Sequence, residues 1–204
     1  MSATEIDQTA PKVTLWLDPV CPFSWNTARW LRAVAEKTGL AIDWQLMNLS
    51  VLNEGRELPP PQQARMRDSQ HIGRLMAAIV RDHGTSAFTA AYFAFGELYF
   101  DRSEPVSADL VAQVLTTVGA RGALAAAVSD ESLDDFIRNQ HQAGQDALGE
   151  TGGSPILRIG EHTFFGPVLK ALPDAEATVA LFDAVAALAA IPQFTQLQRP
   201  RAAA

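Results

Sequence analysis

Cysteine is nearly absent from this sequence, because Cys21 is the only one among 204 residues. A single thiol excludes an intramolecular disulfide and is consistent with a reducing compartment. Long apolar runs are absent too, since no stretch approaches the roughly 18 apolar residues of a membrane span. Residues 1–12 lack the basic region and the apolar stretch of a secretion signal. We therefore expect a cytoplasmic location and no membrane partner.

Positive charge is also scarce. The chain has 16 Lys and Arg against 23 Asp and Glu, a net charge of -7, and its basic residues are scattered. This pattern argues against a nucleic-acid partner. The four histidines share no metal-ligand spacing, so we expect no metal site. Hydrophobic residues, in contrast, make up 48% of the chain, enough for one domain or for one domain carrying an insertion.

The single cysteine stands where a strand pattern gives way to a helical one. Residues 13–17 are typical of a buried strand, and residues 25–35 carry apolar side chains at helical spacing. Pro22 suits the first helical turn, where no amide donor is needed. Cys21 is therefore predicted at a helix N-terminus, where free amides and the helix dipole favour the thiolate. We expect its pKa to lie below the ordinary value of about 8.5.

The residues around this cysteine favour a redox role. The motif Cys21-Pro22-Phe23-Ser24 has the spacing of a Cys-x-x-Cys motif in which a hydroxyl replaces the second thiol. A lone cysteine is more often a small buried hydrophobic residue. The strand before the motif and the helix after it nevertheless favour a reactive thiol. We expect Phe23, beside the thiol, to contact the substrate.

The predicted elements have a recognisable order. Residues 41–49 alternate as a half-buried strand does, and the proline-rich residues 53–61 predict a loop. Residues 61–150 predict helices, residues 155–165 a β-hairpin, and residues 175–190 a last helix. This order, β-α-β, a helical insert, then β-β-α, is that of an α/β thioredoxin fold interrupted by a helical domain.

The expected domain organisation follows from that order. Residues 1–60 form the N-terminal part of the thioredoxin fold, residues 61–150 the inserted helical domain, and residues 151–204 the C-terminal part.

Motifs spread over most of the chain carry a family resemblance: Cys21-Pro22-Phe23-Ser24, Arg29-Trp30, the stretch from Met47 to Asn53, His141-Gln142-Ala143-Gly144, Gly153-Ser154-Pro155 and Phe164-Phe165-Gly166-Pro167. Together they resemble the DsbA-like branch of the thioredoxin superfamily, and within it the mycothiol-dependent nitroreductases and oxidoreductases. The resemblance implies a thiol-disulfide oxidoreductase. It also implies a low-molecular-weight thiol, mycothiol or glutathione, as co-substrate, with no tightly bound cofactor.

The resemblance also implies a site. It places a cis proline, Pro155, beside the sulfur, with Ser154 presenting its backbone to a docking thiol or peptide. Asn53 matches a position that faces the pocket in this group, and His141 lies in the helix that leads back to the Ser154 loop. The candidate catalytic residues are Cys21 and Ser24, and the candidate thiol- and substrate-binding residues are Pro22, Phe23, Asn53, His141, Ser154 and Pro155.

The sequence departs from the group's pattern in two places. The usual motif is Cys-Pro-Trp-Cys, but Phe23 and Ser24 stand at its last two positions here. A tyrosine near the end of the following loop is also missing, and Pro60-Pro61-Gln62-Gln63 stands there instead. Ser24 removes dithiol chemistry and indicates monothiol exchange, in which an external thiol must resolve the mixed disulfide on Cys21. The Ser24 hydroxyl can donate a hydrogen bond to the sulfur.

Two alternatives stay open. Kappa-class glutathione transferases and hydroxychromene-carboxylate isomerases use a similar scaffold with a serine at the start of the catalytic helix, which predicts transferase or isomerase chemistry with a thiol cofactor. The other alternative is a non-enzymatic chaperone or partner-binding domain with an unreactive Cys21. The sequence leaves open the disulfide or electrophilic substrate, the identity of the thiol, and the choice between a monomer and a homodimer.

Overall fold

The computed structural model describes residues 12–120 and 122–199 of the chain. We predicted from residues 1–12 that a secretion signal is absent, and residues 1–11 of that stretch lie outside the described part. Within that part, no helix combines the length and the apolar character that a membrane crossing requires. Among the described residues, no group of three or more His, Cys, Asp or Glu side chains is arranged so that it could hold a metal ion.

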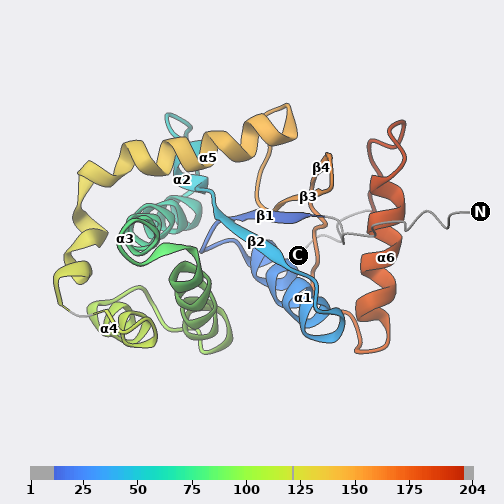
Figure 1. Cartoon of the computed structure of the whole chain (residues 1–204). Helices are drawn as coiled ribbons and strands as arrows, with labels where there is room; N and C mark the ends of the chain where they lie inside the picture. Colours follow the sequence, from blue (N-terminus) through green and yellow to red (C-terminus); the bar gives the residue numbers. More distant parts are fainter. Residues whose placement is uncertain (1–11, 121, 200–204) are drawn as a thin grey trace, which may run out of the picture.

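A four-stranded sheet in the order β2-β1-β3-β4 lies at the centre (Figure 1). Strand β1 (Val13–Leu17) pairs in parallel with β2 (Ile42–Leu46) and antiparallel with β3 (Ile156–Ile159). Strand β4 (His162–Phe165) closes the hairpin with β3. The thioredoxin fold with a helical insertion, predicted from the order of elements, is confirmed.

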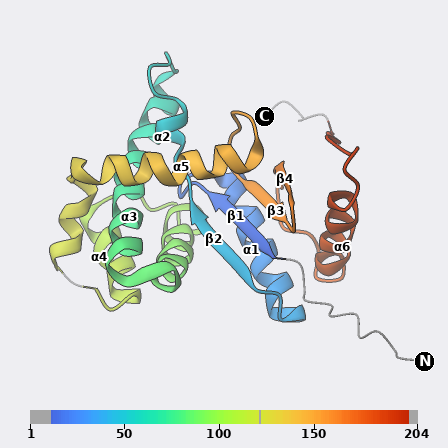
Figure 2. The same ribbon diagram turned by 45° about the horizontal axis from the view of Figure 1, so that its top comes forward.

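Strand β1 lies inside the sheet, between β2 and β3. Both of its faces are covered, so all five of its residues are buried. Leu15 and Leu17 point into the main core, which helix α1 (Pro22–Thr38) also enters. Trp16 points to the opposite face, towards helix α5 (Asp134–Leu148), which lies across the sheet (Figure 2). The carboxyl end of β1 thus leads directly into the motif that precedes α1.

Helix α1 begins at Pro22, as predicted, and runs beyond the predicted residue 35 to Thr38. Pro22 occupies the first turn, Cys21 is the N-cap, and Gly39 ends the helix in the left-handed conformation with a φ of 74°. On its outer side α1 packs against α6 (Ala177–Ala189), where the Trp30 indole donates to the Thr178 carbonyl at 2.9 Å. These contacts fix the direction in which α1 presents Cys21.

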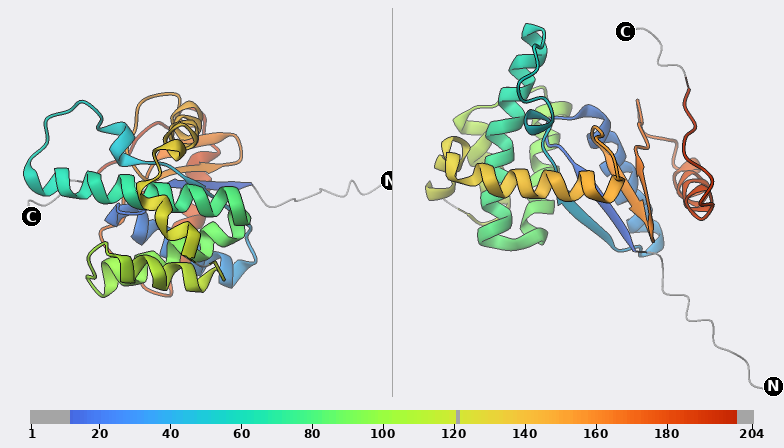
Figure 3. Two further views of the ribbon diagram at one scale, coloured as in Figure 1. Left: turned by 90° about the vertical axis from the view of Figure 1, so that its left-hand side faces the viewer. Right: turned by 90° about the horizontal axis from the view of Figure 1, so that it is seen from above.

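The segment between β2 and β3 is helical, as predicted. Its elements are α2 (Leu49–Leu52), α3 (Pro60–Gly96), the π-helix η1 (Glu97–Asp101), α4 (Ala108–Thr117), the 3₁₀ helices η2 (Gly122–Ser129) and η3 (Glu131–Leu133), and α5. Strand β2 stops short of the predicted residue 49, and the short helix α2 takes its place, because the side chain of Asn48 caps it. Gly84, with a φ of 81°, bends α3 into two arms (Figure 3).

The helical segment and the sheet share one hydrophobic core. The ring of Trp25, in α1, lies 5.9 to 6.1 Å between centroids from Tyr92, Phe93 and Phe100 of the helical segment. Gly96 makes room for it, because a Cβ atom there would lie 2.3 Å from the indole. The division into three domains stays a prediction, since the rings pack across its first boundary.

Replacing Gly96 by alanine tests this close approach. Alanine normally stabilises a helix interior by about 0.5–1 kcal/mol relative to glycine. Here the added methyl group would overlap the Trp25 ring, so we expect Gly96→Ala to lower the free energy of unfolding in urea by about 1–3 kcal/mol. The control, Ala90→Gly on the exposed face of α3, should lose only about 1 kcal/mol. An unchanged or higher stability of Gly96→Ala would contradict the prediction.

Candidate active site

The Cys21 side chain lies against the loop that precedes β3. Its thiol donates to the backbone carbonyl of Ser154 at 3.3 Å between sulfur and oxygen. The Ser154–Pro155 peptide bond is cis, as the resemblance implies, and the Gly166–Pro167 bond, for which we made no prediction, is cis as well. Pro22 and Phe23 are only partly buried in the first turn of α1.

Two serine hydroxyls meet beside this contact. Ser24 Oγ lies 2.5 Å from Ser154 Oγ, although 130 positions separate the two residues. The backbone N–H of Asp18 donates to Ser154 Oγ at 2.9 Å. The fold thus brings four of the predicted residues together, namely Cys21, Ser24, Ser154 and Pro155.

The pKa of Cys21 differs from the expectation. Burial raises the pKa of the thiol, and the Asp18 carboxylate raises it further, while the hydroxyl and amide of Ser24 and the amide of Phe23 lower it only in part. The prediction of a lowered pKa is therefore wrong. Cys21 is only 4% exposed, so the lost hydration of the thiolate outweighs the donors at the helix start.

Asp18 is a residue beside the thiol motif that the sequence analysis did not name as a candidate. Its carboxylate is fully buried and accepts from the amides of Val20 at 2.8 Å and Leu49 at 2.7 Å and from the hydroxyl of Ser69 at 2.6 Å. Burial raises its pKa to about 6, although these three donors act in the opposite direction. An acidic residue at the end of an apolar strand, three positions before Cys21, is the sequence signal that could have identified it.

Asn53 and His141 direct their hydrogen bonds towards α2 and its flanks rather than towards the sulfur. The Asn53 amide donates to the Leu49 carbonyl at 2.8 Å and to the Met66 sulfur at 3.5 Å. His141 is buried, and its Nδ1 accepts a hydrogen bond from the backbone N–H of Asn48 at 3.4 Å. Burial lowers the pKa of His141, which favours the neutral ring.

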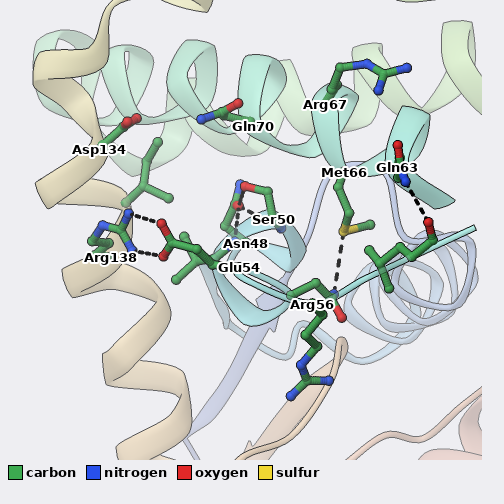
Figure 4. A pocket seen from close by; sticks show the side chains of 14 residues that line it. Asn48, Ser50, Glu54, Arg56, Gln63, Met66, Arg67, Gln70, Asp134 and Arg138 are labelled. Atoms are coloured by element: carbon green, nitrogen blue, oxygen red, sulfur yellow. Dashed lines mark hydrogen bonds and ion pairs between the residues drawn. The ribbon is translucent and has the colours of Figure 1, made fainter. Parts of the chain in front are cut away.

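Asn53 lines a cavity of about 320 Å³ between α2, the loop that follows it, α3 and α5 (Figure 4). Glu54 and Arg138 point towards one another at its edge and form a two-pronged ion pair at 2.5 and 2.9 Å. Cys21 is not among the lining residues. Asn53 was expected to face the pocket of the thiol site; it lines this cavity, and its place in that site stays a prediction.

Side chains of α1 and α5 hold the loops around the sulfur. The Gln145 amide group both donates to the Gly152 carbonyl at 3.1 Å and accepts from its N–H at 2.7 Å. On the other side, the Thr27 hydroxyl donates to the Pro167 carbonyl at 2.7 Å. The position of Ser154 is therefore fixed by contacts outside the thiol motif itself.

The fold and this arrangement of groups define a protein of the thioredoxin fold with a single thiol at the start of helix α1. The model of the Rv2466c-like family, described as mycothiol-dependent nitroreductase Rv2466c, matches residues 20–199, and the chain belongs to this family. The protein is thus a thiol-dependent oxidoreductase. The uncharacterized protein Rv2286c of Mycobacterium tuberculosis is 32% identical over 196 residues, which cover 94% of this chain and 83% of that protein.

Solved structures support the fold. A 2-hydroxychromene-2-carboxylate isomerase has a TM-score of 0.59 at 16% identity and covers 86% of this chain and 95% of its own. The cytosolic disulfide reductase DsbM of Pseudomonas aeruginosa, solved with GSH, has a TM-score of 0.57 at 14% identity, with 85% and 98% covered. Chlamydia trachomatis DsbA has a TM-score of 0.58 at 11% identity, with 91% and 90% covered. At these identities the likeness shows the fold alone.

Asp18→Asn should remove a pH-dependent part of the stability. The pKa of Asp18 is about 6 in the folded protein against an ordinary value of 3.8, so between these values the folded protein holds a proton that the unfolded chain has released. Folding takes up this proton, and the contribution of Asp18 to the free energy of unfolding falls by on the order of 3 kcal/mol as the pH rises through the window. Urea unfolding at about pH 4 and about pH 7 measures the effect.

The stability of Asp18→Asn relative to wild type should therefore improve from the lower to the higher pH. The control, Ser69→Ala, loses one hydrogen bond to the carboxylate but keeps the carboxyl group, so it should keep the pH dependence. An Asp18→Asn variant that follows the wild-type pH profile would show that another group is responsible.

Proposed function

We propose that the protein catalyses monothiol exchange through Cys21. The Cys21 thiolate forms a bond to one sulfur of a disulfide or mixed disulfide, the substrate S–S bond breaks, and the departing sulfur takes up a proton. A low-molecular-weight thiol then attacks the mixed disulfide, forms a new disulfide with the bound group, and restores Cys21. Electrophilic small molecules are the second substrate class.

One observation carries this proposal. The Cys21 sulfur, the Ser24 hydroxyl and the Ser154 backbone and hydroxyl meet at one point, and Cys21 is the only cysteine in the chain. Ser24 therefore cannot resolve a mixed disulfide, and resolution falls to an external thiol. Pro22 and Phe23 follow Cys21 directly and Pro155 follows Ser154, and these three residues are proposed to contact the substrate.

The family description supports mycothiol as this thiol, and glutathione is the other candidate. Neither would be tightly bound. Asn53 and His141 are proposed to bind the part of the thiol or substrate that lies beyond the sulfur, on the α2 side of the site. A single cysteine also fits a reducing compartment, which supports a cytoplasmic location for a monomer or a homodimer.

The raised pKa of Cys21 has a kinetic consequence. A thiolate of higher pKa is less populated at neutral pH but is the stronger nucleophile. The rate of exchange should therefore rise with pH through neutrality, because the fraction of thiolate rises.

A transferase or isomerase is the second candidate. In that reaction the thiolate of a noncovalently bound thiol cofactor, stabilised by Ser24, would attack the electrophile. Cys21 would form no covalent bond to the substrate or the cofactor. The presence of a buried hydroxyl beside the sulfur position favours this alternative.

Intact mass measurement separates the two reactions. With a small disulfide and no external thiol, the wild type should accumulate one adduct on Cys21, and Cys21→Ala should form none and lose exchange activity. Ser24→Cys should instead close a reversible disulfide with Cys21 and turn over without waiting for the external thiol.

The matched control, Ser24→Ala, lacks the second thiol and should still accumulate the adduct. Full activity in Cys21→Ala would reject the covalent mechanism and select the transferase or isomerase. An inert wild-type Cys21, together with no turnover, would select the non-enzymatic alternative.

A further inference from the structure

One buried hydroxyl of the helical segment has no partner. Tyr92 lies on the second arm of α3, after the bend at Gly84, and is only 1% exposed. Within the described part of the chain, its hydroxyl makes no hydrogen bond. An unpaired buried hydroxyl is unfavourable, so its presence in a packed core needs a reason. Phenylalanine would fill the same space without this penalty.

The ring of Tyr92 packs against the helix that begins after Cys21. Its centroid lies 6.1 Å from the ring of Trp25, whose backbone N–H donates to the Cys21 carbonyl at 3.0 Å. Phe88 and Phe93 of its own helix hold the ring from other sides, at 6.3 and 5.5 Å between centroids. The ring is therefore fixed at the junction between α3 and the first turn of α1.

The negative groups that act on Tyr92 belong to the thiol site. Burial raises the pKa of Tyr92 well above its ordinary value, and the Cys21 thiolate and the Asp18 carboxylate raise it further, in that order of strength. Arg29 acts in the opposite direction. A phenol in this setting keeps its proton at neutral pH and remains a hydrogen-bond donor, and donors bind most strongly to charged acceptors.

Of the two negative groups, the sulfur is the one that needs a further donor. Both carboxylate oxygens of Asp18 already accept a backbone N–H group, and one of them also accepts a hydroxyl. The Cys21 thiol, in contrast, is itself a donor, to the Ser154 carbonyl at 3.3 Å. The sulfur becomes a strong acceptor only when it ionises. Until then the Tyr92 hydroxyl stays unpaired.

We infer that Tyr92 is a reserve donor of the thiol site, whose hydroxyl is unpaired in the resting protein and donates to the Cys21 sulfur once that sulfur is negative. This inference rests on the proposed function, in which the Cys21 thiolate attacks and is later released. It assigns the helical segment a part in the chemistry. The protein thereby gives up some stability in its resting form for a better stabilised thiolate.

The test is Tyr92→Phe, which keeps the ring and removes only the hydroxyl. The variant should unfold at a higher urea concentration at neutral pH, because it no longer buries an unpaired hydroxyl. At the same time, the titration midpoint of Cys21, read from the rate of alkylation with iodoacetamide against pH, should rise. We expect about threefold to tenfold less thiolate at neutral pH than in the wild type.

The other tyrosine of the chain is the matched control. The Tyr99 hydroxyl donates to the Asp68 carboxylate at 3.0 Å, and burial together with Asp68 raises its pKa to about 12. Tyr99→Phe therefore removes a hydroxyl that has a partner. It should unfold at a lower urea concentration than the wild type and leave the Cys21 midpoint unchanged.

The inference is overturned if Tyr92→Phe leaves the Cys21 midpoint unchanged. It is also overturned if Tyr92→Phe destabilises the protein as Tyr99→Phe does, since the hydroxyl would then have a partner in the resting state. An unchanged midpoint with an altered pH dependence of stability between about pH 4 and pH 7 would overturn it by assigning the hydroxyl to Asp18.

These readouts need no substrate turnover, so they are independent of the exchange reaction. A failure of the proposed function would appear instead as a missing mixed disulfide on a Cys21 that titrates as expected in both tyrosine variants.

Discussion

The hydrogen bonds of Asp18 hold together the segments that make the site. Its carboxylate binds the start of the thiol motif, α2 and α3 through Val20, Leu49 and Ser69, and its amide binds Ser154 of the distant loop. The carboxylate is removed from water, so each of these donors replaces part of its lost hydration. The replacement is incomplete, which is why its pKa rises to about 6.

The same burial that organises the site restrains the thiol. Cys21 loses nearly all contact with water when the loops close around it, and the carboxylate of Asp18 adds a charge of the same sign as the thiolate. The hydroxyl and amide of Ser24 and the amide of Phe23 oppose both effects. The resting sulfur is therefore a thiol whose proton is donated to the Ser154 carbonyl. The same contacts that bury the Cys21 thiol therefore also set its pKa.

Sequence patterns predicted those parts of the structure that depend on neighbouring residues. Five successive buried residues before Asp18, a proline in the first turn after Cys21, and a hairpin late in the chain all follow from local patterns. The pKa of Cys21 could not be predicted in this way, because it depends on burial by segments such as the Ser154 loop, 133 positions away in the chain. The network around Asp18 was missed for the same reason, since its partners lie in four separate segments: the turn before Cys21, α2, α3 and the loop before β3. The placement of Ser154 beside the sulfur came from the family resemblance and not from spacing.

The aromatic contact of Trp25 shows how the helical segment constrains the chemistry. Trp25 follows Ser24 directly, packs into the space left by Gly96, and donates from its indole to Asp101 at 3.1 Å. The first turn of α1 is thus anchored in the helical segment. Separating the two parts would expose large buried rings to water, which is unfavourable in proportion to the apolar area uncovered. The structure therefore favours access to Cys21 through side chains and short loops, such as the partly exposed Phe23, over access through an opening between domains.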